Sequence, residues 1–134
     1  MNRRKAREQA FILTFEKIFN EEDAVEELYK TAIEEEVIQD DDFTKELSSK
    51  TQEHIEDIDI FIEKYSKGWA IRRIPKVSLA ILRNAICEML YIDEVPVSVA
   101  INEAVELTKT YGGDNDSSFV NGILGSLSRD ECNG

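Results

Sequence analysis

The sequence has few cysteines and no long apolar run, and these absences exclude several classes of protein. Cys87 and Cys132 are its only cysteines, too few for a disulfide framework or a zinc cluster. No apolar stretch approaches the roughly 20 residues that a membrane-spanning helix needs. The opening Met1-Asn2-Arg3-Arg4-Lys5 lacks the apolar segment and cleavage site of a signal peptide. We therefore expect a cytoplasmic globular protein that is neither secreted nor inserted into a membrane.

Helix-breaking residues are also scarce, since the 134 residues include two prolines and six glycines. Between these breakers, apolar residues recur at three- and four-residue spacing, which indicates amphipathic helices. No segment alternates apolar and polar residues for long enough to predict a strand. The expected helices cover residues 3–19, 22–38, 43–66, 76–92, 97–110 and 117–128. The predicted fold class is all-α, a bundle of five to seven helices.

The ends of these helices can be assigned from glycine and from polar side chains. We expect Gly68 to end the third helix in the position after its C-cap, where glycine is favoured. Gly112-Gly113 should close the fifth helix, and Asp116 or Ser117 should cap the sixth. Trp69, which follows Gly68, is expected to be an apolar anchor.

No enzyme signature is present, and we expect no catalytic residue, metal or cofactor. His54 is the single histidine, and a solvated or helix-packed role is the preferred interpretation over a general base. Cys87 lies in an apolar helix and is expected to be a core residue, whereas Cys132 should be exposed. Asp114-Asn115-Asp116 resembles the start of a calcium loop but lacks that loop's later glycine and acid, so helix capping is preferred.

Charge is distributed unevenly along the chain. The total is 16 basic and 28 acidic residues, a formal net charge of −12. Residues 1–20 hold five basic and two acidic residues, a net charge of +3, whereas residues 21–68 hold 17 acids and five bases, a net charge of −12. A basic end on an acidic body indicates a localised anion-binding site. The acidic segment is interpreted as a solvated face, with a basic protein partner as the alternative.

Four cations form the basic end: Arg3, Arg4, Lys5 and Arg7. They stand at the start of a predicted helix, where the helix dipole favours anions, so helix stability does not explain them. Closely spaced cations can neutralise successive phosphates, and arginine also stacks on bases or hydrogen-bonds to them. Nucleic-acid binding and an ordinary basic N-terminus kept for solubility both remain open on this evidence.

Five motifs follow one another along the chain. They are Arg3-Arg4-Lys5-Ala6-Arg7-Glu8-x-Ala10, Gly68-Trp69-x-Ile71-x-Arg73-Ile74, Ile81-Leu82-Arg83-x-Ala85-x-x-Glu88-Met89-Leu90, Val95-Pro96 followed by Ala100-Ile101-Asn102-Glu103-Ala104-Val105-Glu106-Leu107, and Phe119-Val120-Asn121-Gly122-Ile123-Leu124. Their content and order resemble the NusB family of transcription antitermination factors. The set spans about residues 3–127, and its order makes the resemblance highly specific.

The resemblance implies a non-enzymatic, all-helical domain of two small packed subdomains, at about residues 1–68 and 69–130. Members of this family pair with NusE, a protein of the small ribosomal subunit. The pair binds the single-stranded boxA element of nascent ribosomal RNA and, with NusA and NusG, makes RNA polymerase resist termination. Some relatives self-associate as homodimers and would then cover the RNA face. NusE is expected on exposed parts of the segments 76–92 and 97–110.

The resemblance also carries RNA-contact roles onto particular residues of this chain. These residues are Arg3, Arg4, Lys5, Arg7, Lys76, Arg83 and Phe119. Two alternatives stay open: Arg83 could be a structural arginine paired with Glu88 or Glu103, and Phe119 could be a core residue. Relatives often have a lysine just before the phenylalanine, and Ser118 stands there in this chain.

Two other functions compete with RNA binding. The first is a protein-interaction adaptor that uses its acidic middle without reading RNA sequence. The second is the NusB-like module of some ribosomal RNA methyltransferases, which is disfavoured because no glycine-rich nucleotide-binding domain follows. The net charge of −12 predicts weak RNA binding by the chain alone and a need for NusE to supply positive charge.

Overall fold

The computed structural model describes residues 1–132, and most of these residues are helical. The elements in order are α1 (Arg3–Phe19), α2 (Val25–Glu34), α3 (Asp42–Glu53), α4 (Ile55–Tyr65), the short 3₁₀ helix η1 (Ile71–Arg73), α5 (Lys76–Tyr91), α6 (Val97–Tyr111) and α7 (Asp116–Glu131). No strand occurs in the described part of the chain, which confirms the predicted all-α class. No helix within residues 1–132 is both long and apolar enough to cross a membrane.

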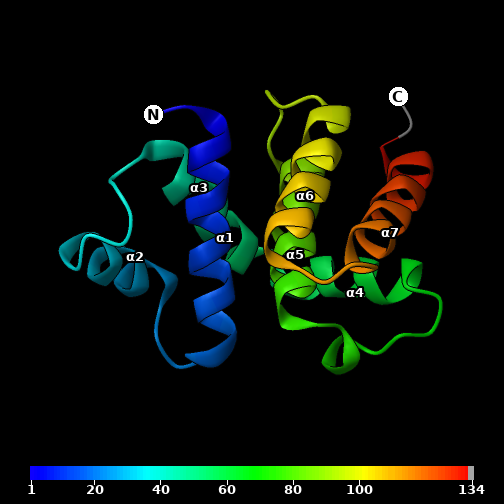
Figure 1. Cartoon of the computed structure of the whole chain (residues 1–134), viewed down its shortest axis with the longest axis horizontal. Helices are drawn as coiled ribbons and strands as arrows, with labels where there is room; N and C mark the ends of the chain where they lie inside the picture. The colour runs from blue at the N-terminus through cyan, green and yellow to red at the C-terminus, as the bar shows by residue number, and fades with distance from the viewer. Residues whose placement is uncertain (133–134) are drawn as a thin grey trace.

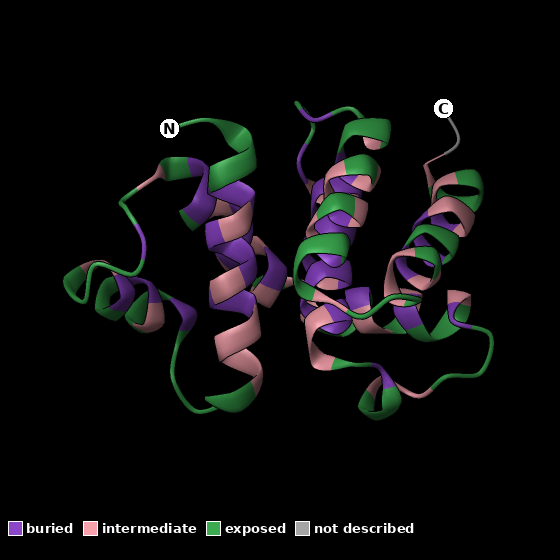
Figure 2. Cartoon of the chain, in the orientation of Figure 1, coloured by how far each residue is buried: buried purple, intermediate pink, exposed green. Residues whose placement is uncertain are grey.

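Helix α5 is the centre of the bundle. It packs against α1 and α3 on one side and against α4, α6 and α7 on the other, while α2 covers α1 and α3 (Figure 1). Eleven of its 16 residues are buried, which agrees with the apolar character of nearly its whole circumference in the sequence. Figure 2 shows buried residues concentrated along α5 and on the sides of α1 and α3 that face it. Buried Cys87 lies on α5, as predicted, and its burial raises the pKa of its thiol to about 11.

One main hydrophobic cluster joins the two ends of the chain. It includes Leu47 of α3, Leu82 of α5 and Leu124 of α7, so it crosses the expected boundary near residue 68. A smaller cluster packs α2 against α1 through Leu13, Tyr29 and Ala32. Residues on both sides of that boundary thus share one continuous core. The division into two subdomains stays a prediction.

The prediction of a single helix over residues 43–66 is wrong, because the segment forms two helices. His54 is the C-cap of α3 and the N-cap of α4, with φ −106° and ψ 19°. Its imidazole stacks on the Tyr91 ring at the end of α5, with the ring centroids 3.7 Å apart. This contact between elements distant in sequence fixes the break, and the apolar periodicity continues across it.

Several helix ends also differ from the expectation. The second helix, expected over 22–38, is shorter and covers Val25–Glu34. Helix α4 ends at Tyr65 and has Ser66 as its C-cap, so Lys67, with φ 53°, follows the cap and Gly68 comes one residue later. Helix α7 has Asn115 as its N-cap, while the Asp116 side chain accepts a hydrogen bond from the Gly113 N–H at 2.7 Å.

Candidate nucleic-acid interface

The basic residues near the N-terminus occupy the first turns of α1. The Asn2 side chain caps this helix, because its Oδ1 accepts a hydrogen bond from the Lys5 N–H at 2.8 Å. The first turn contains no acidic residue, so the positive end of the helix dipole adds to the charges of the side chains. Arg3, Arg4 and Lys5 are exposed, and this end of α1 therefore offers positive potential to solvent.

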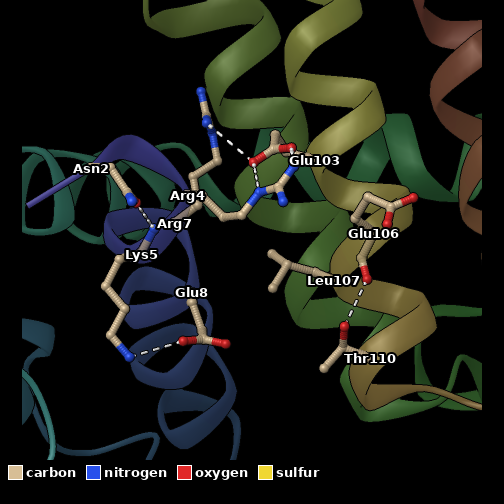
Figure 3. A pocket seen from close by; sticks show the side chains of 9 residues that line it. All are labelled: Asn2, Arg4, Lys5, Arg7, Glu8, Glu103, Glu106, Leu107 and Thr110. Carbon is tan, nitrogen blue, oxygen red and sulfur yellow. Dashed lines mark hydrogen bonds and ion pairs between the residues drawn. The ribbon is translucent and has the colours of Figure 1, made fainter.

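Arg4 joins α1 to α6 through Glu103. Its Nε lies 3.1 Å from Oε1 and its Nη2 lies 2.8 Å from Oε2 of that carboxylate. The Arg4 side chain stays 74% exposed, whereas the Glu103 side chain is only 14% exposed. The hydrogen bonds from Arg4 lower the pKa of Glu103 despite its partial burial. Figure 3 shows both Arg4 and Arg7 directed toward Glu103 in a pocket of about 350 Å³ between the two helices.

Arg7 faces the interior. Its Nε donates to both carboxylate oxygens of Glu88, at 2.9 and 3.0 Å. The two side chains are 7% and 4% exposed, and the Arg7 Nη1 also lies 3.8 Å from Glu103 Oε1. Burial raises the pKa of Glu88 even though the Arg7 guanidinium opposes that shift. The ion pair thus explains the arginine without RNA, and the RNA contact of Arg7 stays a prediction.

Arg3 and Lys5 are fixed by weaker contacts. The Arg3 guanidinium lies 3.9 Å from the centroid of the Phe43 ring, a cation–π arrangement. The Lys5 Nζ lies 3.1 Å from Glu8 Oε1. The other Glu8 oxygen accepts from the Tyr111 hydroxyl at 2.7 Å, and this bond is the main cause of the lowered pKa of Glu8. Both cations keep charge available at the surface.

Acid should loosen α1 from α6. Glu103 and Glu8 each bond across these two helices, and each has a pKa below its ordinary value of 4.5. A carboxyl group with a lowered pKa stabilises the fold fully above its unfolded value, and that stabilisation is lost as the pH falls through the folded value. Below pH 4.5, we expect the thermal midpoint of the Glu103→Gln variant to fall less steeply than that of the wild type. Glu106→Gln on the same helix should keep the wild-type profile, and equal profiles for all three proteins would contradict the prediction.

Lys76 and Arg83 lie in a different place, along a groove of about 620 Å³ at the start of α5 that Arg72 and Lys17 also line. The Arg83 guanidinium is bidentate to Asp59 of α4, with distances of 2.9 and 2.8 Å. A structural pairing was one of the two open alternatives for this arginine, but the expected partners were wrong. Glu88 and Glu103 are instead bound by arginines of α1.

Phe119 lies at a third place, near the start of α7. It is half-buried, and its ring meets the Trp69 ring edge-on, with the centroids 5.8 Å apart. Trp69 is 51% exposed, so it is not the simple apolar anchor that the sequence suggested. The sequence motifs did not identify Trp69, Arg72 or Lys17 as candidate RNA-binding residues.

The predicted RNA-contact residues therefore fall into three groups. The starts of α5 and α7 both lie toward one end of the bundle, and the start of α1 lies toward the opposite end (Figure 1). A ligand that contacts all three groups must be extended, which suits a single strand that runs along the bundle.

Comparison with known proteins gives a consistent result. The NusB family model matches residues 4–129. A transcription antitermination protein NusB of Natranaerobius thermophilus is 41% identical over 128 residues, which cover 92% of each chain. A chain in the crystal structure of a plectonemic RNA supercoil has a TM-score of 0.89 and 30% identity, covering 100% of this chain and 99% of that one. A chain in the crystal structure of antitermination factors NusB and NusE with dsRNA has a TM-score of 0.84 and 28% identity, covering 95% and 96%.

Proposed function

The chain belongs to the NusB family of transcription antitermination proteins, and we propose that it acts by binding boxA-type single-stranded RNA together with NusE. The observation that carries the proposal is the exposed basic start of α1, where Arg3, Arg4 and Lys5 stand beside one another on an otherwise acidic chain. Phosphate contacts of this kind supply most of the affinity for a nucleic acid and carry little sequence information. We therefore propose that these residues anchor the RNA at the start of α1.

The other two groups extend this proposed path. Lys76 and Arg72 line the groove at the start of α5, where no side chain caps the first helical turn within the described structure. Free backbone N–H groups and the helix dipole favour an anion at such a position. Phe119 is half-exposed and offers an aromatic surface to a base. Together these contacts suit an extended strand better than a duplex.

The proposed role is that of a non-enzymatic assembly factor. The complex would work in the cytoplasm, with NusA and NusG, on RNA polymerase, and NusE would cover exposed parts of α5 and α6. NusE would also offset the net charge of −12, which opposes RNA binding by the free chain. A homodimer of the free protein would compete with RNA for the same surface.

Fluorescence anisotropy of labelled boxA RNA tests the proposal directly. The free chain should bind weakly, and addition of NusE should tighten binding at least about tenfold, equivalent to about 1.4 kcal/mol. A scrambled RNA of the same composition is the matched control. If the complex binds both RNAs equally well, the proposal fails. The chain is then a protein-interaction adaptor that uses its acidic face without reading RNA sequence. Sizing the free protein shows whether self-association limits its affinity.

A further inference from the structure

The pocket of about 350 Å³ between the start of α1 and α6 contains equal numbers of positive and negative side chains. Three cations and three carboxylates line it: Arg4, Lys5, Arg7, Glu8, Glu103 and Glu106. The proposed function brings RNA phosphates to this same place, where each of the cations already lies beside a carboxylate. An RNA phosphate must therefore compete with carboxylates of the protein for the basic side chains.

Glu103 is the strongest of these competitors. Its two oxygens accept hydrogen bonds from Nε and Nη2 of Arg4, and such a bidentate pair is stronger than a single contact. The Glu103 side chain is only 14% exposed, so solvent and salt screen its charge less than that of a fully exposed residue. The other two carboxylates of the pocket pair with lysines three residues away on their own helices, and such pairs are weak.

Arg4 can leave Glu103 without stranding the carboxylate. The Arg4 side chain is 74% exposed and stands in the first turn of α1, so its guanidinium can turn outward without disturbing the core. The Arg7 side chain is only 7% exposed, and its Nη1 lies 3.8 Å from Oε1 of Glu103 (Figure 3). After Arg4 has turned away, Arg7 still offsets the charge of Glu103, which lowers the cost of separating the pair.

We propose that Glu103 is an internal competitor for RNA: its carboxylate holds Arg4 in the free chain, and Arg4 exchanges it for an RNA phosphate on binding. A guanidinium binds carboxylate and phosphate with the same bidentate geometry, so Arg4 is paired before and after the exchange. This inference rests on the proposed function and deepens it, because it makes Glu103 a residue that limits RNA affinity. Anions that reach only this pocket are then bound weakly, whereas a strand that also reaches the other two groups can offset the loss.

RNA titration of the Glu103→Gln variant tests the exchange. Glutamine keeps the size of the side chain and removes its charge. The titration follows the anisotropy of labelled boxA RNA and uses the free chain, because α6 belongs to the surface on which NusE is expected. We expect the affinity at 0.1 M salt to rise about fivefold, which corresponds to the strength of one exposed ion pair.

Glu106→Gln is the matched control. Glu106 lines the same pocket about one turn further along α6, but its carboxylate lies 3.4 Å from Lys109 Nζ rather than beside a cation of α1. The control variant removes the same single negative charge, so a general gain in attraction for RNA is common to both variants. We expect Glu106→Gln to change the affinity by less than about twofold.

A double-mutant cycle shows whether Glu103 acts through Arg4. Arg4→Ala should weaken RNA binding less in the wild type than in the Glu103→Gln variant, because only the wild type must separate an ion pair before Arg4 reaches a phosphate. In the Arg4→Ala background, Glu103→Gln should therefore raise the affinity no more than Glu106→Gln does. Thermal unfolding of each variant at pH 7 checks that folded proteins are compared.

Three results would overturn the exchange. Equal affinities of Glu103→Gln and Glu106→Gln would show that Glu103 acts only through the net charge. A lower affinity of Glu103→Gln would show that Glu103 orients Arg4 for the phosphate, and a gain that persists without Arg4 would assign the effect to another cation. Each of these results leaves the proposed function standing, because the wild type still binds RNA. Failure of the wild-type complex with NusE to bind RNA would overturn both.

Discussion

Replacing Arg7 with alanine should lower the free energy of unfolding by about 3–5 kcal/mol, because the change leaves the Glu88 carboxylate buried without its cation. The Glu88 side chain is only 4% exposed, and the Arg7 Nε is the donor to both of its oxygens. Urea denaturation at pH 7 measures the loss. A change below about 1 kcal/mol would show that water or another group replaces the arginine.

The loss should grow with pH. Burial already raises the pKa of Glu88, and removal of Arg7 takes away a group that lowers it. A carboxyl group whose folded pKa is raised favours the fold below its unfolded pKa, and that advantage is lost as the pH rises through the folded value. The Arg7→Ala variant should therefore be closest to the wild type near pH 4.5, the ordinary value of the group, and further from it at pH 8.

An apolar pair provides the control. Arg7→Met combined with Glu88→Leu removes both charges at similar volume, and such replacements of buried pairs are often neutral or stabilising by about 1–4 kcal/mol. We expect the double variant to be much more stable than Arg7→Ala at pH 8 and to lack the extra loss of stability that Glu88 causes as the pH rises. An equal loss in both variants would contradict the ion-pair explanation. The stable double variant also tests the predicted RNA contact of Arg7, since a drop in RNA affinity would then be due to the lost contact.

The buried position of Arg7 could have been predicted from the sequence, although four adjacent cations suggested a common role. Arg7 stands four residues before Phe11 and seven before Thr14, and both of these are buried on α1. The same helical spacing that identified the core of α1 thus places Arg7 on its inner face. Arg3 belongs to the same row, but it lies at the exposed first turn, with its guanidinium over the Phe43 ring.

Other features depend on tertiary contacts, which the local sequence pattern does not reveal. Helix positions follow from apolar periodicity, but the break at His54 depends on a stack with Tyr91 from another helix. Charge pairing is similarly non-local: several carboxylates were available to Arg83, and the packing of α4 on α5 selects Asp59. The exposure of Trp69 depends on the turn at Lys67, a residue type that gives no signal for a left-handed conformation.

The combined variant Arg3→Ala, Arg4→Ala and Lys5→Ala should weaken RNA binding about 100-fold at 0.1 M salt. Each phosphate contact to a single strand contributes about −0.7 to the slope of log affinity against log salt, so three lost contacts flatten it by about two. If the two proteins bind alike near 1 M salt, that difference in slope gives the stated factor at 0.1 M. The fold should lose no more than about 1 kcal/mol, the contribution of the Arg4–Glu103 pair, because Arg4 is mostly exposed.

A second triple variant separates local contacts from net charge. Lys30→Ala, Lys50→Ala and Lys64→Ala also removes three positive charges from a chain whose net charge is −12, but these lysines lie on α2, α3 and α4, outside the three groups and off α5 and α6, where NusE is proposed to bind. Long-range repulsion of RNA should rise equally in both variants, whereas direct phosphate contacts are lost only at the start of α1. Salt titrations of the complexes with NusE should therefore give the wild-type slope for the control. Equal slopes for the two triple variants would mean that the first turn of α1 acts only through its contribution to the overall electrostatic field of the protein. The RNA would then have to be anchored at the groove beside α5.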